Sequence, residues 1–434
     1  MALDLPTTGN RLRSTWKMLK DPFGAYARWR ATLGPTFVIR SLNGDVVVSC
    51  APDFVADVLK LTDDEHVPFA TKAAAGVLGP GTMIVTPGQA HARKRRLAGP
   101  HFRGERMRAY AGIVDDVARA QIRGWRGELR LMDETLPISL EIIIRAVFGA
   151  GDRADVDRFR AEITDVVDRL SPTFLFTHHT QRRFWGLGPW ARYSDARDRL
   201  AGHLIERIEA RRADPSTAHS DILTALALAR DEDGDHLPRQ EVAEELIGLL
   251  FAGHETTQIA LAWAIYWLHR FPETLAKLRR ELADAPPDPA ARLKLPYLDA
   301  VVNETLRLHP IVPDILRTLS VDKTLGGVPL KAGQHVALAA AMTHNEPHIY
   351  PDPQRFDPER FVGRRPRPQT FLPFGAGVRR CIGAALATFE MKLVIAEIVC
   401  GVDLELLSEE VPVRRNVTTA PKHGVRMRVL GHRS

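Results

Sequence analysis

Residues 374–383 read FGAGVRRCIG and lead directly into an apolar segment of helical pattern at residues 384–402. The stretch places Cys381 at the start of that helix, where unpaired backbone N–H groups and the positive end of the helix dipole lower the pKa of a thiol. Gly375 and Gly377 allow a sharp turn close to a flat group, and Phe374 can shield the sulfur from water. A single cysteine in the stretch excludes a Cys-x-x-Cys zinc site. The pattern therefore favours a heme iron bound by one thiolate, and Arg379 offers a cation to a carboxylate.

All fixed positions of this stretch match F-G-x-G-x-R-x-C-x-G, the heme-ligand loop of the cytochrome P450 family. The chain resembles that family from about residue 20 to its C-terminus. A lone cysteine beside a glycine turn would otherwise be interpreted as a buried structural residue. The resemblance implies a mainly α fold with a smaller β region: a triangular helical body with a long central helix, and a small β-sheet lobe. It also implies heme b, with its iron axially ligated by Cys381 and with Phe374 and Arg379 in contact with the cofactor.

The composition is that of a globular chain with a large core, since 45% of its 434 residues are hydrophobic and 26% are charged. Length alone suggests two or three domains. The motifs make sense only if they converge on one cofactor, so we expect residues 1–434 to form a single domain. Three widely separated cysteines imply no disulfide framework and suit a reducing cytoplasm. Residues 1–33 are polar and basic, which predicts neither a signal peptide nor a membrane anchor, and we expect a soluble, cytoplasmic monomer.

A second motif, GQAHARKRR, occupies residues 88–96. The spacing of four places His91 and Arg95 on one helix face. The motif resembles the family element W-x-x-x-R, whose two side chains hold a heme propionate; His91 takes the tryptophan position and keeps an N–H donor. The alternative is a solvated basic face or a nucleic-acid patch. Nucleic acid is disfavoured because neither interleaved aromatic residues nor a recognised binding motif accompanies the charges.

A helical pattern runs over residues 239–269, long enough to cross the molecule at roughly 46 Å. Its two apolar runs are too short to span a bilayer and flank the polar segment HETTQ. Thr256 is expected to bond back to the Ala252 carbonyl and open the turn, and Gly253 to leave a gap that can hold O2 and water. AGHETT resembles the family's A-G-x-[DE]-T-T oxygen-activation motif, which implies catalytic roles for Thr256 and Glu255. The alternative is a helix kink with a satisfied threonine.

Glu304 and Arg307 share a helix face and resemble the family's E-x-x-R pair. The resemblance implies that they form a buried ion network with Arg360 under the heme loop, so we assign the three residues to structure and heme retention. It also places Arg317 on a propionate. Asp314 is unusual there; a local salt bridge is favoured over contact with a polar or cationic substrate.

The remaining patterns are weaker. Asn43-Gly44 between two β-rich runs predicts a hairpin, and residues 66–88, rich in Gly, Ala and Pro, are interpreted as a long loop that overhangs the substrate pocket in the resembled family. The net charge of +6 suits an acidic partner, nucleic acid or an anionic surface, and charge alone does not choose among them. The basic residues expected to face such a partner on the cysteine side are Arg93, Lys94, Arg96, Arg364, Arg365, Arg367 and Arg380.

The sequence thus predicts a heme-thiolate monooxygenase that inserts one oxygen atom of O2 into a mostly apolar small molecule, by hydroxylation or epoxidation. Electrons are expected from a separate ferredoxin- or flavodoxin-type donor and its reductase, since no flavin or iron–sulfur segment is visible. Two alternatives stay open: a peroxide-driven heme-thiolate enzyme, which the intact Glu255-Thr256 pair disfavours, and a heme-based gas sensor or carrier. The residues do not select among lipid, terpenoid, macrolide and aromatic substrates.

Overall fold

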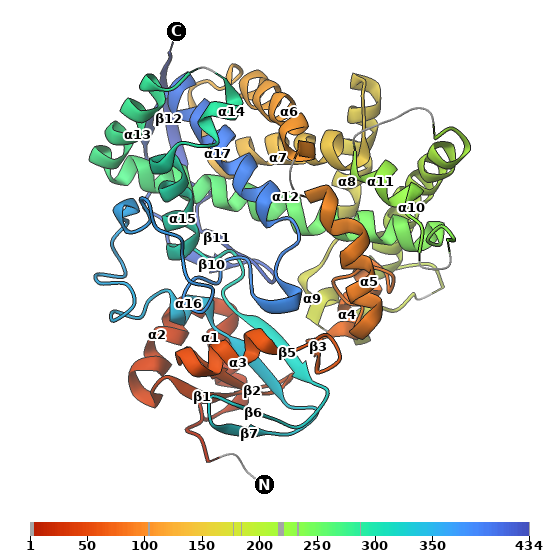
Figure 1. Ribbon diagram of the computed structural model, residues 1–434, viewed down its shortest axis with the longest axis vertical. Coiled ribbons are helices and arrows are strands. Elements are labelled where there is room, and N and C mark those ends of the chain that lie inside the picture. The colour runs from red at the N-terminus through yellow and green to blue at the C-terminus, as the bar shows by residue number, and fades with distance from the viewer. Residues whose placement is uncertain are drawn as a thin grey trace.

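The computed structural model describes residues 4–102, 105–176, 178–183, 185–215, 221–231, 234–286 and 288–433. Helices form a broad body, and a β-rich lobe that carries the N-terminus lies at one end of the long axis, opposite the C-terminus (Figure 1). The prediction of a mainly α fold with a smaller β region is confirmed.

The long central helix α12 (Arg239–Arg270) organises the helical body (Figure 1). It packs against α7 (Leu131–Phe148), α10 (Pro189–Ala213), α15 (Pro296–Leu308) and α17 (Ala384–Gly401). Its predicted bounds are confirmed within one residue, and its second half, from Ile259 to Leu268, is buried apart from Trp267 because apolar side chains occur on every face. The other helices are α1 (Arg11–Lys20), α2 (Pro22–Leu33), α3 (Pro52–Lys60), α4 (Thr71–Leu78), α5 (Gly88–Ala98), α6 (Glu105–Ile122), α8 (Arg153–Asp168), α9 (Pro172–Phe176), α11 (Ile222–Leu228), α13 (Pro272–Asp284), α14 (Pro289–Arg292) and α16 (Ala340–Thr343).

The β lobe contains a five-stranded sheet in the order β1-β2-β8-β5-β3. Its first two strands form the predicted antiparallel hairpin, but the turn residues are Leu42 and Asn43, one position earlier than the Asn-Gly pair suggested, and Gly44 opens the second strand with φ of +115°. The strands are β1 (Thr36–Ser41), β2 (Gly44–Ser49), β3 (His66–Pro68), β4 (Glu128–Arg130), β5 (Ile315–Leu319), β6 (Lys323–Leu325), β7 (Val328–Leu330), β8 (His335–Leu338), β9 (Val402–Leu406), β10 (Pro412–Arg414), β11 (Thr419–Pro421) and β12 (Arg426–His432).

The interpretation of residues 66–88 as one long loop is wrong. The segment contains strand β3 and the eight-residue helix α4. Three consecutive alanines favour the helix strongly enough to outweigh Gly76 inside it, and Gly79 ends the helix with φ of +98°. Only the part that follows α4 is irregular.

Glu390 is a carboxyl group buried in the helical body, with 1% of its surface exposed, on α17. Burial raises its pKa to about 8, nearby Ser139 offsets this only partly, and its Oε1 has no hydrogen-bond partner among the described residues. The folded chain therefore holds a proton that the unfolded chain loses near pH 4.5. Stability from this group is present below that pH and is lost as the pH rises toward 8.

We expect Glu390→Gln to flatten this pH dependence. Between pH 5 and 8 the wild-type free energy of unfolding should fall by roughly 4 kcal/mol more than that of the variant, because glutamine has no proton to lose. Urea unfolding followed by circular dichroism across this range measures the difference. Glu405→Gln, at an exposed glutamate on β9, should keep the wild-type slope. Equal slopes for Glu390→Gln and wild type would contradict the assignment.

Candidate functional site

The loop before α17 is closed by its own backbone. The amide of Cys381 donates to the carbonyl of Phe374 at 2.8 Å, and Gly375 and Gly377 have φ of +67° and +66°. A Cβ on Gly377 would lie 2.8 Å from the carbonyl oxygen of Leu59 on α3, so the loop can pack there only with glycine. The predicted sharp turn is confirmed.

Cys381 lies in a recess: it keeps accessible surface, yet so many protein atoms surround it that burial raises the pKa of its thiol. The Gly383 amide favours the thiolate, as the sequence predicted, and Arg380 and Arg95 also favour it, but together they do not outweigh burial. The expectation that the pKa of the Cys381 thiol is lowered is therefore wrong when only protein groups surround the sulfur. A metal cation at the sulfur would supply the missing positive charge.

Four N–H donor side chains assigned to the cofactor from the sequence, one histidine and three arginines, come from three segments. His91 and Arg95 lie on α5, Arg317 on β5, and Arg379 in the loop before Cys381. Burial, together with the charge of a neighbouring arginine, lowers the pKa of Arg317 and of Arg379 to about 10. Arg95 acts electrostatically on His91, Arg379 and Cys381. The fold thus gathers three arginines and His91 near the cysteine.

Two of these arginines are largely buried but form few hydrogen bonds to described residues. Arg317 is 7% exposed and donates one long hydrogen bond, from Nη1 to the Leu316 carbonyl at 3.4 Å. Arg379 donates from Nη1 and Nη2 to the carbonyls of Met83 and Thr86 at 3.4 and 2.7 Å, while its Nε is buried without a hydrogen-bond partner in the described residues. Buried guanidinium groups that are short of anions fit a ligand that brings carboxylates, as the propionates of heme do.

Asp63 is a site residue that the sequence analysis missed. Its Oδ1 accepts a hydrogen bond from Nδ1 of His91 at 2.6 Å and lies 3.8 Å from Nε of Arg379. The negative charge of Asp63 raises the pKa of His91 and of Arg379, whereas burial lowers the pKa of both residues. The pairing fixes the His91 ring and leaves Nε2 for a second partner. The acid precedes His91 by 28 positions, so no short spacing signals the contact.

The central helix carries the second part of the site. Thr256 Oγ1 donates to the Ala252 carbonyl at 2.7 Å, so the predicted back-bond is confirmed, although α12 stays helical throughout. Ala252 is exposed in the middle of this helix, and Glu255 and Thr256 are half-buried. The gap predicted beside Gly253 is not there: a Cβ at this position would lie 2.8 Å from Ile143 Cδ1, so the glycine serves close packing of α12 on α7.

The predicted ion network is also present. Glu304 and Arg307 are 0% exposed and form two hydrogen bonds of 2.6 and 2.8 Å, and Arg360 Nε lies 3.4 Å from Glu304 Oε1. His344 extends the network toward the cysteine loop, because its Nδ1 contacts the Arg307 carbonyl at 2.9 Å and its Nε2 accepts from the Leu372 amide at 2.8 Å. Burial lowers the pKa of His344 to about 3, so the ring is neutral.

Comparison with known proteins decides the family, because the sequence model of cytochrome P450 matches residues 5–425. The chain belongs to the cytochrome P450 family. Cytochrome P450 135B1 of Mycobacterium tuberculosis is 37% identical over 390 residues, which cover 85% of this chain and 78% of the relative. Cytochrome P450 138 of the same organism is 31% identical over 392 residues, covering 89% and 86%.

Two solved structures share the fold. Retinoic acid-bound cyanobacterial CYP120A1 aligns over 99% of this P450 and 100% of its own chain with a TM-score of 0.85 at 24% identity. The cytochrome P450DA heme domain aligns over 100% and 99% with the same TM-score at 22% identity. The predicted P450 fold is therefore confirmed. As a P450, the protein is a heme-thiolate oxidoreductase of the monooxygenase class. Within the described ranges, no helix is both long and apolar enough to cross a membrane.

The unusual Asp314 of this P450 has the local partners that the sequence favoured. Its Oδ2 accepts from Arg414 Nη2 at 3.0 Å and from the hydroxyl of buried Tyr26 at 3.2 Å. The acid and the arginine are 7% and 10% exposed. Asp314 therefore contacts β10 through a buried salt bridge with Arg414 and α2 through a hydrogen bond from Tyr26.

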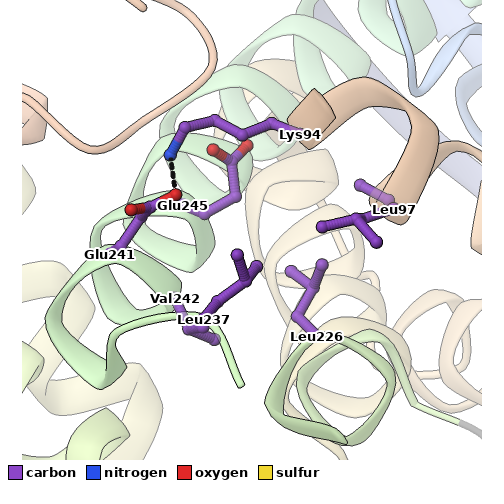
Figure 2. Close-up of a pocket in the computed structure, with 8 residues that line it drawn as sticks. Lys94, Leu97, Leu226, Leu237, Glu241, Val242 and Glu245 are labelled. Atoms are coloured by element: carbon purple, nitrogen blue, oxygen red, sulfur yellow. Dashed lines mark hydrogen bonds and ion pairs between the residues drawn. The ribbon is translucent and has the colours of Figure 1, made fainter. Parts of the chain in front are cut away.

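Two residues of the predicted basic face form ion pairs with acidic residues. Lys94 is buried and forms an ion pair with Glu241 of α12 at 2.5 Å, and Arg93 pairs with Asp231 and Glu241. Figure 2 shows Lys94 reaching Glu241 beside a small cavity that Leu97, Leu226, Leu237 and Val242 also line. The cavity holds about 10 Å³, room for roughly one water molecule and for no substrate.

Glu245, one turn further along α12, connects this cluster to the site. Its Oε2 accepts from the Met83 amide at 2.6 Å, and the Met83 carbonyl in turn accepts from Arg379. Burial raises the pKa of Glu245 to about 7. The central helix therefore holds the segment after α4 against the arginine that precedes the cysteine.

Proposed function

We propose that this P450 inserts one oxygen atom of O2 into a mostly apolar small molecule, with Cys381 as the axial ligand of heme b. His91, Arg95, Arg317 and Arg379 are assigned to the heme propionates. The supporting observation is the gathering of buried, anion-poor arginines beside a recessed cysteine. When bound, heme supplies the one-electron chemistry that activates O2.

The protein's own side chains are assigned to binding the heme, shielding the sulfur and delivering protons. We assign Phe374 to shielding of the sulfur; the Arg380 guanidinium lies 5.9 Å from the centre of the Phe374 ring. We assign Thr256 to proton delivery, because its hydroxyl is held at one position by the Ala252 carbonyl while its oxygen can still accept a hydrogen bond. Half-buried Glu255 precedes it in the chain and can exchange protons with solvent.

The test of this assignment is Thr256→Ala. The variant should keep its heme and its spectrum but release most of the reducing equivalents as hydrogen peroxide, with product per NADPH falling by about tenfold or more, because one positioned proton-transfer group typically contributes 10²–10⁴-fold. Product, peroxide and NADPH are measured together with a supplied donor and reductase. Thr32→Ala removes a similar back-bond, at 2.9 Å, from α2 and should stay coupled. Fully coupled turnover in Thr256→Ala would refute the role.

The same assay separates the alternatives. Product formation with peroxide alone, at a rate equal to that with donor and reductase, would favour a peroxide-driven enzyme. Reversible O2 binding without NADPH consumption would favour a sensor or carrier. A spin-state screen of apolar compounds then identifies the substrate class.

We propose that the electron donor is an acidic protein that docks at the exposed Arg364, Arg365 and Arg367. These arginines lie between Arg360 of the ion network and the cysteine loop. Neutralising Arg364 and Arg365 to glutamine should weaken donor binding about tenfold at low salt and by less than about twofold at high salt, because screening removes long-range attraction. Titration of the heme spectrum with donor measures it. Arg426→Gln with Arg428→Gln on β12 controls for net charge, and a salt-independent loss would contradict docking by charge.

A further inference from the structure

The N-terminal helix α1 presents its apolar side chains to solvent. Leu12, Trp16 and Leu19 are 65%, 59% and 51% exposed, whereas the one fully buried residue of the helix is the polar Ser14. Positions i, i+4 and i+7 lie on one face, so the three side chains form a continuous row, here named the apolar stripe. A helix of a globular protein normally buries such a face, and this one does the opposite.

The outward direction of the apolar stripe is fixed by contacts on the other side of α1. Arg11 Nη1 donates to the Ser41 carbonyl at 2.7 Å, and Thr15 Oγ1 accepts from the Leu42 amide at 3.0 Å. Ser14 Oγ lies 2.8 Å from Thr8 Oγ1, and Met18 packs on the apolar cluster of the β lobe. Figure 1 shows α1 in the β lobe next to α2.

Positive charge accompanies the apolar stripe. The helix contains Arg11, Arg13, Lys17 and Lys20 and no acidic residue, and the Lys20 ammonium lies 4.8 Å from the Trp16 ring centre. The neighbouring acids are already paired: Asp45 with Arg11 at 2.8 Å, and Asp21 with Arg28 at 3.6 Å.

We propose that α1 docks this protein reversibly on an anionic lipid surface. An apolar row containing tryptophan, flanked by lysine and arginine, is the chemistry of a helix that lies in the plane of a bilayer interface. The stripe is a convex ridge, which a fluid lipid surface can accommodate without a preformed groove. The helix has ten residues, far too few to span the bilayer, so the contact is peripheral. Docking needs no heme chemistry, and its failure would leave the proposed function untouched.

The test is co-sedimentation of the heme-loaded, full-length protein with vesicles of phosphatidylcholine alone or mixed equally with phosphatidylglycerol. Binding to the anionic vesicles should be at least about tenfold tighter than to the neutral ones and should weaken with salt. The triple variant Leu12→Glu, Trp16→Glu, Leu19→Glu should lose at least about tenfold in binding. All three positions are exposed, so the heme spectrum, which reports folding, should not change.

Leu430→Glu is the matched control, because Leu430 on β12 is 64% exposed outside α1 and should keep wild-type binding. Arg13→Gln with Lys17→Gln should reduce binding to anionic vesicles only. Failure of the wild type to bind either vesicle, or equal binding by the triple variant, would overturn the proposal. So would self-association in sedimentation velocity that the triple variant abolishes without vesicles, since the stripe would then contact a second copy.

Discussion

Replacing Cys381 by histidine is expected to abolish the red-shifted Soret band of the reduced carbonyl complex and to lower monooxygenase turnover by at least about 1,000-fold. A neutral imidazole does not donate electron density to iron as a thiolate does. The recess around residue 381 is bounded by the loop that the Phe374 carbonyl closes, and histidine retains a ligating atom there. Spectra of the reduced carbonyl complex, together with product assays, measure both effects.

Cys400→Ser is the matched control for that variant, because Cys400 is a half-buried cysteine on α17 itself. It should keep the wild-type spectrum and turnover. Heme content, from a pyridine hemochrome assay, separates loss of the thiolate from loss of the cofactor. An unchanged carbonyl spectrum in Cys381→His would refute ligation by this residue.

The parts of the site that sequence predicted well depend on neighbours within a few positions. The back-bond of Thr256 joins residues four apart, the Glu304–Arg307 pair joins residues three apart, and the turn of the cysteine loop follows from two glycines. Such contacts are set by helix geometry and backbone freedom, which short spacings encode. The long central helix was predictable because its helical pattern is also a matter of short spacings along the chain.

The parts that sequence did not predict depend on what the fold brings together. Nothing local relates Asp63 to His91, Lys94 to Glu241, or Gly253 to Ile143. Each contact joins separate segments and decides whether a group is paired, exposed or tightly packed. The pKa of the cysteine thiol is likewise set by burial, a tertiary property, against the local amide and charges that favour the thiolate.

The second large effect is expected from Glu304→Gln. Glu304, with a side chain that is 0% exposed, balances Arg307 and Arg360, and its Oε1 also accepts from the Asp357 amide at 2.9 Å. Removing the negative charge leaves buried positive charge uncompensated, which costs roughly 3–5 kcal/mol of folding free energy. Urea unfolding of the purified protein, followed by circular dichroism, measures the loss.

The network should also control heme retention, because the Arg307 carbonyl holds His344 and the His344 ring holds the amide of Leu372, two residues before Phe374. Transfer of heme from Glu304→Gln to apomyoglobin should therefore be faster than from the wild type. Asp157→Asn breaks surface ion pairs with Arg153 and Arg160 on α8 and should cost at most about 1 kcal/mol with no change in heme transfer. If Glu304→Gln and Asp157→Asn lost equal free energy of unfolding, burial would not explain how the network stabilises the fold. If Glu304→Gln were less stable but did not lose heme faster than the wild type, the network would contribute to folding stability and not to heme retention.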